Sequence, residues 1–291
     1  MTQILMALLT ASRAKAGRAC KRLHHLEYDE GFRPATEEDV LRFGSLVHRG
    51  LEAWWNAKKD GQPQDAWRDA AIAALVGEMD PFDLARAQVA MMGYHLRWKD
   101  EPYEVLAVEV QFETDLRNPA TGRSSRTWRL AGKIDVVVRD LRDNLVRVVE
   151  HKTASEDVSP GSDYWKRLRM DGQVSVYFEG ATSLGYAAAA CLYDVLAKPA
   201  LRPGNVPLVD PDGVKIVHDA AGVRVRTKDG KKFRQTGDTE LGYVLQTRPE
   251  TPEEFRDRLA SAVAESPDRY FSRGDVVRLD GEMNEALFDI W

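Results

Sequence analysis

The first third of the chain is dominated by apolar residues spaced at helical intervals. Residues 36–55 follow this repeat, and Thr36 with Asp39 forms a candidate capping box at the start of the stretch. A helix is also expected within the first 26 residues. The pattern therefore predicts, after this N-terminal helix, three further helices over 36–55, about 63–76 and about 81–98.

The middle of the chain changes to β patterns. Apolar and polar residues alternate over 105–115, and two almost continuous apolar runs follow at 128–138 and 145–152. Such runs are typical of strands that are buried on both faces. The polar segment Arg139–Asn144 between the two runs is expected to form a hairpin turn. A helix over 163–180 and another buried strand over 186–193 follow.

Beyond residue 200 the pattern becomes irregular. Short strands are expected at 214–218 and 223–227, with a turn at Asp229-Gly230. Near the end of the chain, a strand over 275–279 and a short helix are expected. We interpret the chain as one domain over 1–291, with a core of about 10–200 and with 201–291 packed on it as an extension.

One helix in this last part has a clear start signal. Thr251 can cap the helix, Pro252 suits its first position, and Glu254 can complete a capping box.

Composition narrows the class of protein only slightly. The 291 residues are 43% hydrophobic and 30% charged, and the net charge is −5, as in an ordinary globular protein. No apolar run approaches the length of a membrane span. The apolar segment Met1–Leu9 is followed by basic residues, which is the reverse of a signal peptide, so a cytoplasmic protein is expected. The two cysteines, Cys20 and Cys191, are too few for a disulfide framework.

Two local clusters of positive charge could bind nucleic acid in spite of the negative net charge. One lies within residues 13–22 and the other within 123–133. DNA binding stays possible because enzymes that act on DNA need only a local basic region. Each cluster could equally be a solvated surface.

The predicted hairpin carries the candidate chemistry. Asp135 lies on its first strand, and Glu150 and Lys152 lie on its second. Residues two apart on a strand point to the same face, so Glu150 and Lys152 share one side. Two carboxylates there would form a hard-oxygen site for Mg²⁺ or Mn²⁺. Charges on a hairpin are often only solvated, but the apolar neighbours favour a buried site. Glu109, on the preceding strand, could add a carboxylate but is expected to be a plain strand residue.

Four short motifs occur in a characteristic order. They are Gly44–His48 on the early helix, Gly132–Asp135 and Glu150–Lys152 on the hairpin, and Gln173–Tyr177 on the helix that follows. In this order the chain resembles the RecB-like branch of the PD-(D/E)XK nuclease superfamily, which includes phage exonucleases and the nuclease domains of recombination helicases. The resemblance covers roughly residues 10–200. It implies an α/β fold with a restriction-endonuclease-like core: a central mixed sheet flanked by helices, a helical N-terminal part and an irregular C-terminal extension.

The resemblance also implies roles for the metal ligands. Asp135 and Glu150 would bind the catalytic Mg or Mn ion, and the backbone carbonyl of His151 would be a further ligand. The side chain of His151 alternates to the other face and is given no chemistry. His48 would be an additional metal ligand, and an imidazole favours Mn²⁺ over Mg²⁺.

The remaining motif residues would act on water and DNA. By the same resemblance, Lys152 would position or deprotonate the attacking water. Gln173 and Tyr177, one helical turn apart, would face the active site and contact the DNA strand or order the catalytic groups. Taken alone, Tyr177 could be a core residue and Gln173 a surface residue.

One feature of several relatives is missing. They hold an iron–sulfur cluster through one N-terminal and three C-terminal cysteines, whereas Cys20 has no C-terminal trio to join it. No iron–sulfur cluster is therefore expected. The chain also has no Walker A sequence, so any unwinding of DNA would need a partner such as a helicase or a single-strand annealing protein.

The expected function is metal-dependent hydrolysis of DNA, from its ends, in recombination, repair or phage DNA processing in a bacterial cell. Three alternatives stay open at this point: a structure-specific or sequence-specific endonuclease, a non-catalytic DNA-binding scaffold with the nuclease fold, and an unrelated hydrolase of small phosphoesters. No membrane partner is expected, and the oligomeric state is open.

Overall fold

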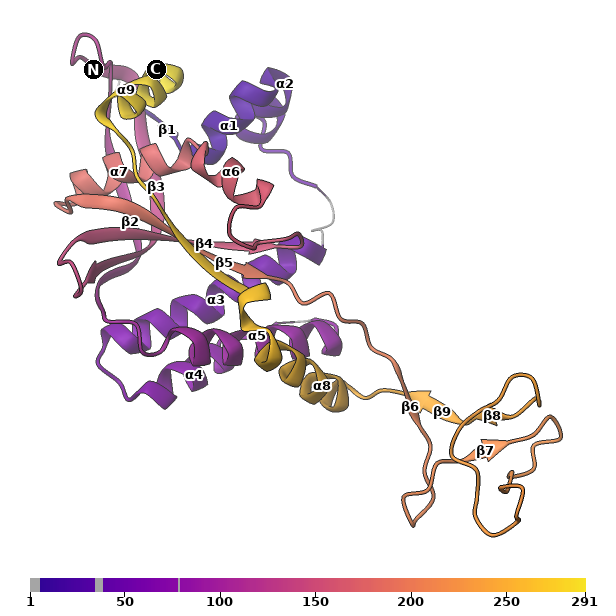
Figure 1. Ribbon diagram of the computed structural model, residues 1–291. Coiled ribbons are helices and arrows are strands. Elements are labelled where there is room, and N and C mark those ends of the chain that lie inside the picture. The colour runs from indigo at the N-terminus through magenta and orange to yellow at the C-terminus, as the bar shows by residue number, and fades with distance from the viewer. Residues whose placement is uncertain (1–5, 35–38, 78) are drawn as a thin grey trace.

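The protein is built around a six-stranded mixed sheet, seen in a computed structural model that describes residues 6–34, 39–77 and 79–291 (Figure 1). Strand β3 pairs with three other strands. Along one edge β3 pairs with β2, and its other edge is shared between β1 and β4. β5 pairs with β4, and β10 pairs with β5 as the edge strand on that side. The strands of this sheet are β1 (Ala7–Leu9), β2 (Tyr103–Arg117), β3 (Ser124–Asp140), β4 (Val146–Ala154), β5 (Ala188–Ala197) and β10 (Phe271–Val276).

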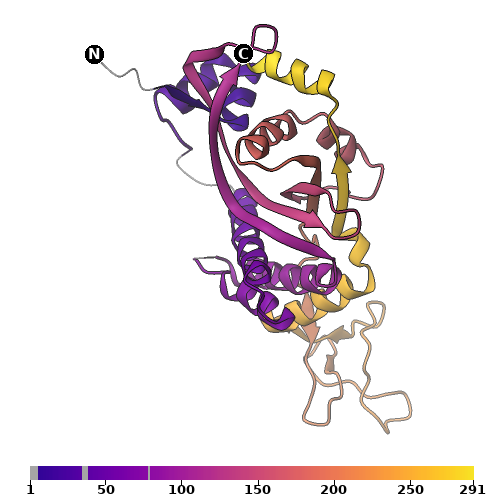
Figure 2. The same cartoon turned by 90° about the vertical axis from the view of Figure 1, so that its left-hand side faces the viewer.

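Helices cover both faces of the sheet (Figures 1 and 2). One face is packed by α3 (Asp39–Lys59), α4 (Gln64–Ala73), α5 (Pro81–Trp98) and α8 (Pro252–Glu265). The other is packed by α6 (Asp163–Arg169) and α7 (Gln173–Ser183). Near this second face lie α1 (Ala11–Ala19), α2 (Lys21–His24), a π-helical turn (His25–Asp29) and α9 (Asp280–Ile290). A short 3-10 turn (Pro267–Arg269) joins α8 to β10.

The apolar runs of β3 and β4 are explained by these two layers. Val136 and Val149 pack into the core beneath α3, whereas their neighbours Val137 and Val148 pack into the core beneath α7. Because successive side chains of a strand point to opposite faces, both faces need apolar residues when both are covered. The predicted buried hairpin is therefore confirmed.

Most predicted elements are present with shifted ends. The strands expected at 105–115, 128–138, 145–152 and 186–193 are β2 to β5, and the helix expected at about 81–98 is α5. Thr251 caps α8 and forms the predicted capping box with Glu254. The capping box proposed for Thr36 lies outside the described residues, and the final strand lies at Phe271–Val276, earlier than expected.

Two local predictions were wrong. The single helix expected over 163–180 is divided into α6 and α7 at Met170–Gly172. There the Asp171 carboxylate accepts the backbone N–H of Gln173, and Arg278 donates to the Asp171 carbonyl, so polar contacts replace one helical turn. Residues 223–227 form isolated bridges and no strand, and tight turns with glycine at positive φ, Gly222 and Gly230, lie on either side of them.

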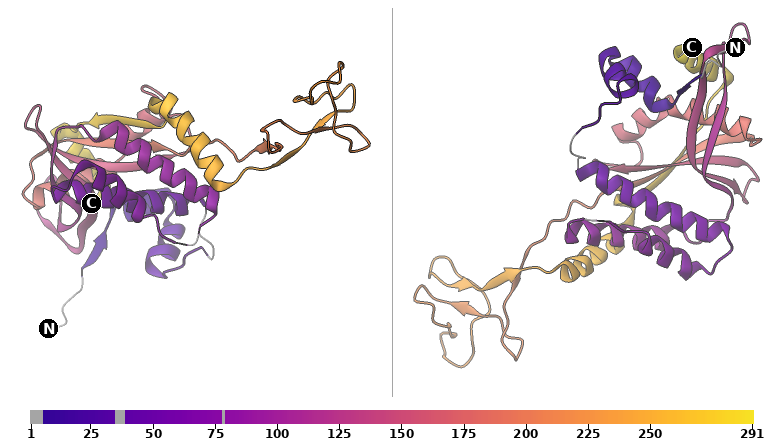
Figure 3. Two further views of the ribbon diagram at one scale, coloured as in Figure 1. Left: turned by 90° about the horizontal axis from the view of Figure 1, so that it is seen from below. Right: turned by 180° about the vertical axis from the view of Figure 1, so that it is seen from behind.

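The chain beyond residue 200 separates into two structural parts. Residues 205–249, with β6 (Asn205–Pro207), β7 (Val217–His218), β8 (Val244–Leu245) and β9 (Thr247–Pro249), project from the body as an arm (Figures 1 and 3). By contrast, α8 packs against α5 and β10 pairs with β5 inside the central sheet. The expected division of the chain into domains stays a prediction.

None of the helices in the described part of the chain has both the length and the hydrophobicity that crossing a membrane requires.

Candidate active site

The candidate site lies where β4 separates from β3. The register of the two strands ends at the pair Val136 and Val149. Asp135 precedes Val136 on β3, and its carboxylate accepts the backbone N–H of His151, two residues beyond Val149 on β4, over 2.9 Å. The Asp135 side chain thus takes the place of the next strand partner, and it is almost fully buried at this fork. A carboxylate at this point both satisfies the freed N–H and offers a second oxygen to the site.

Glu150 and Lys152 face the same side of β4, as their spacing predicts. The Lys152 Nζ lies 2.6 Å from Oε1 of Glu150, and the Glu150 side chain is only 5% exposed. The structure therefore brings Asp135, Glu150 and Lys152 together on the face of the sheet that α7 covers.

Helix α7 contributes the polar groups that hold this cluster. The Gln173 Oε1 accepts from Lys152 Nζ over 2.8 Å, and its Nε2 donates to Glu150 Oε1 over 3.0 Å. The same Nε2 lies 2.5 Å from the hydroxyl of Tyr177, one turn further along the helix. Gln173 therefore bridges both charged residues of β4 to Tyr177. This arrangement depends on α7 starting at Gln173, directly after the break in the helix.

His48 approaches the site from α3. Its Nδ1 lies 3.9 Å from the Asp135 carboxylate. Burial lowers the pKa of His48, although the Asp135 charge opposes this shift. The neutral imidazole is the form that can bind a metal ion.

The side chain of His151 points away from the site, as the alternation of the strand predicts. On the opposite face, its Nδ1 lies 3.3 Å from the carboxylate of Asp194 on β5. Asp194 also accepts from the guanidinium of Arg273 and from the hydroxyl of Tyr94. Burial by itself lowers the pKa of His151, but the close contact with the charged Asp194 outweighs it and raises the pKa. Only the backbone of His151 takes part in the site.

Burial and neighbouring charges shift the pKa values of several residues in the site. Burial, and then the neighbouring charge of Asp135, raise the pKa of Glu150 to about 7, while Lys152 pulls it down. Burial would lower the pKa of Lys152, yet the adjacent Glu150 outweighs burial and raises it. Burial raises the pKa of Tyr177 as well, together with the charges of Glu150 and Asp135. Lys152 is therefore an ammonium ion here, and Tyr177 keeps its proton.

The donor set fits a hard divalent cation. Oε2 of Glu150 is buried without a hydrogen-bond partner, and Asp135 adds a second carboxylate close by. An unpartnered buried carboxylate oxygen is costly, and a cation would relieve this cost. Among the described residues, however, no three histidine, cysteine or acidic side chains are already gathered as a metal cage. The Lys152 ammonium instead neutralises Glu150, so a cation has to compete with it.

Glu109, which the sequence predicted to be a plain strand residue, lies beside the site. The pairs Val108–Val136 and Val110–Ile134 put Glu109 across from Asp135. Its backbone has φ of 52°, its carboxylate forms an ion pair with Lys133, and burial, followed by the charge of Asp135, raises its pKa. The sequence signal was an acidic residue that interrupts an apolar strand next to the hairpin.

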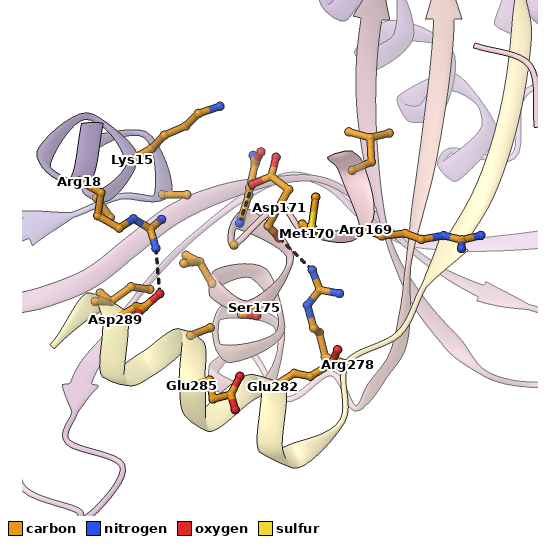
Figure 4. Close-up of a pocket in the computed structure, with 18 of the residues that line it drawn as sticks. Lys15, Arg18, Arg169, Met170, Asp171, Ser175, Arg278, Glu282, Glu285 and Asp289 are labelled. Carbon is orange, nitrogen blue, oxygen red and sulfur yellow. Dashed lines mark hydrogen bonds and ion pairs between the residues drawn. The ribbon is translucent and has the colours of Figure 1, made fainter. Parts of the chain in front are cut away.

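A cleft leads from the cluster to the surface (Figure 4). It has a volume of about 940 Å³, and Lys152 and Gln173 are among the residues that line it. The other walls come from α1, from the junction of α6 and α7, and from the segment that ends in α9.

A sheet that presents two carboxylates and a lysine at a strand fork defines a class of metal-dependent hydrolases. The chain belongs to the PD-(D/E)XK nuclease superfamily, whose family model matches residues 8–275. The fold predicted for this superfamily, an α/β core with a central mixed sheet, is confirmed. Its nuclease members generally use divalent metal ions.

The other comparisons add little. No curated protein matches the chain at a significant level. A solved structure described as "Crystal structure of SSO0001" is 12% identical, with 99% of this chain and 88% of that chain covered and a TM-score of 0.32. A likeness of this degree carries no argument about function.

Proposed function

We propose that the protein is a deoxyribonuclease of the RecB-like branch that uses Mg²⁺ or Mn²⁺ and degrades DNA from its ends. The observation that carries the proposal is the cluster of Asp135, Glu150 and Lys152 at the fork of β3 and β4. Membership of a nuclease superfamily supports hydrolysis of phosphodiester bonds as the chemistry.

Two carboxylates and one imidazole would hold the metal ion. Asp135 and Glu150 supply hard oxygen donors, His48 supplies nitrogen, and the backbone carbonyl of His151 is an additional candidate. When bound, the ion would polarise the phosphate and lower the pKa of a coordinated water.

Lys152 suits the role of a charged positioning group. Because Glu150 raises its pKa, Lys152 is a poor proton acceptor in this geometry. Its ammonium can instead orient the attacking water and balance negative charge that develops on the phosphate. Gln173 holds the ammonium in place from α7, and Tyr177 supports Gln173. These two residues order the cluster.

Attack from DNA ends is favoured over attack at internal sites. The chain carries no zinc-finger spacing and no convincing helix-turn-helix, so nothing in it would read a base sequence. The basic residues of 13–22 and 123–133 would contact phosphates instead, which positions DNA without reading it. DNA is the proposed partner, and a helicase or a single-strand annealing protein would supply unwound ends.

A nuclease assay with two DNA forms tests the proposal. Purified protein is incubated with end-labelled linear DNA and with closed-circular DNA, each with Mg²⁺, Mn²⁺ or EDTA. We expect the linear form to be degraded to short products with either metal, no degradation in EDTA, and survival of the circle. Asp135→Asn is the inactive control. Efficient cutting of the circle at low enzyme would favour an endonuclease, and absence of all cleavage would favour a non-catalytic scaffold.

A further inference from the structure

The cleft beside Lys152 has walls of opposite charge (Figure 4). The α1 wall is basic and carries Lys15 and Arg18, while Arg169, from the end of α6, lies on the other side of the cleft. Within the described residues, Lys15 and Arg169 have no ion-pair partner, so their charges are available. Unpaired cations along a cleft that ends at a candidate nuclease site are suited to phosphate groups.

The facing wall is acidic and comes from α9. Glu285 and Asp289 lie one helical turn apart on this helix and line the same cleft. Asp289 approaches Arg18 at 3.8 Å, and both side chains remain substantially exposed, at 72% and 46%. Such an exposed pair contributes little to stability. α9 has no buried residue, and Glu285 and Asp289 add negative charge to its side of the cleft.

Arg278 lines the cleft beside the junction of α6 and α7. Its guanidinium donates to the carbonyl of Asp171 at the junction of α6 and α7. Gln173, which begins α7, lines the cleft and contacts Lys152 at the same time. A chain of phosphates lying along the basic wall would therefore lead directly to the cluster of β4.

We propose that this cleft is the path of one DNA strand to the active site. Phosphates of the strand contact Lys15, Arg18 and Arg278, and the carboxylates of Glu285 and Asp289 repel it, so that it lies against the α1 wall. This inference rests on the proposed nuclease function, because it assigns the route by which the substrate reaches Lys152.

The size of the cleft suits a short length of a single strand. Its volume of about 940 Å³ falls within the ~300–1,000 Å³ of pockets that enclose small ligands. The proposal therefore assigns a short length of a single strand to the cleft, and a duplex is the comparison in the test below. Non-specific binding of single strands by a basic groove of this kind is sensitive to salt.

Equilibrium binding of a fluorescent single-stranded oligonucleotide and of a blunt duplex tests the path. All variants carry Asp135→Asn, so that no DNA is cleaved, and binding is measured over a range of salt concentrations. Lys15→Ala with Arg18→Ala should weaken binding of the single strand by roughly tenfold and reduce the salt slope by about 1.4, since each phosphate contact contributes ~0.7. Binding of the duplex should change much less.

Two further variants complete the design. Lys21→Ala with Arg22→Ala removes the same charge from the same basic segment, but these residues on α2 do not line the cleft, so they are the matched control. Glu285→Gln with Asp289→Asn should tighten binding of the single strand several-fold.

The inference is overturned if the Lys15/Arg18 variant binds no more weakly than the Lys21/Arg22 control, or if the Glu285/Asp289 variant binds no more tightly than its parent. Failure of the proposed function is seen separately. In that case the protein with native Asp135 cleaves no DNA, whatever the binding variants do. Normal cleavage with no effect of the cleft variants refutes only the path.

Discussion

The Nζ of Lys152 lies 2.6 Å from Oε1 of Glu150, at the centre of the candidate site. In this contact the ammonium neutralises a buried carboxylate that a metal ion would also need. The lysine therefore has two opposing effects: it stabilises the cluster without metal, and it competes with a divalent cation for Glu150.

Because of this competition, removal of the Lys152 ammonium should have opposite effects on metal binding and on catalysis. Lys152→Ala should tighten binding of Mn²⁺ severalfold, because a positive charge next to the carboxylates is removed. The same change should slow DNA hydrolysis by at least about a hundredfold, because the group that orients the water is lost. Calorimetric titration and single-turnover cleavage measure the two effects. Weaker Mn²⁺ binding by the variant would show that Lys152 helps to assemble the metal site.

Two substitutions of Asp135 should distinguish its effect on catalysis from its effect on the stability of the fold. Asp135→Asn and Asp135→Ala both remove a metal-binding charge and should both reduce hydrolysis by at least about a hundredfold, since metal activation is worth several kcal/mol. Only Asp135→Ala leaves the N–H of His151 without its acceptor, which costs about 1–3 kcal/mol of stability.

Denaturant unfolding and nuclease assays check both parts of this prediction. Glu113→Ala is the matched control, because Glu113 is an exposed strand carboxylate paired with Arg129 outside the site. Near-normal cleavage by Asp135→Asn would refute the assignment of the site.

The raised pKa of Glu150 predicts a pH-dependent cost in stability. Without metal, the unfolded chain loses this proton near pH 4.5, whereas the folded protein holds it until about pH 7. Both states are protonated below the first value, so there is no cost there. As pH rises from about 4.5 to about 7 the folded state loses relative stability, by ~3 kcal/mol in all. Glu150→Gln should therefore stabilise the metal-free protein at pH 8 and have little effect at pH 4.

Unfolding by urea in EDTA at the two pH values measures this difference. A stabilisation of equal size at pH 4 and pH 8 would mean that the gain comes from packing and not from the proton.

His48 is expected to adjust the occupancy and the choice of metal. His48→Ala should weaken Mn²⁺ binding by about 10-fold or more while binding of Mg²⁺ changes less, because imidazole prefers Mn²⁺. The motivation is its neutral ring 3.9 Å from Asp135. Glu52→Gln, one turn along α3, is a suitable control for altered charge nearby. Identical Mn²⁺ affinity of His48→Ala and the native protein would make His48 an ordinary, partly exposed helix histidine.

Gln173 and Tyr177 should differ in importance. Gln173→Ala breaks the contacts to Lys152, Glu150 and Tyr177 at once and should slow hydrolysis by roughly 10²-fold, since a misplaced catalytic group can cost that much. Tyr177→Phe removes one hydroxyl and leaves the ring packed on Phe112, so a loss of less than about tenfold is expected. Equal losses for the two variants would assign the hydroxyl of Tyr177 a direct role.

Local patterns along the sequence were sufficient for much of the fold. The strict alternation of side chains on a strand put Glu150 and Lys152 on one face and His151 on the other. The apolar periodicity predicted α5 and the strands β2 to β5, and the capping box predicted the start of α8 at Pro252. These features depend only on neighbours within one or two turns, so a single sequence contains them.

Tertiary structure decided the contacts that make the cluster a site. Residues 163–180 have continuous helical character, whereas at the break before α7 the Asp171 carbonyl accepts from Arg278, more than a hundred residues away. Glu109 faces Asp135 only because β2 and β3 pair in one particular register. The fork itself exists because β3 shares one edge between β1 and β4, and pairing between distant strands is not encoded in the period of either strand.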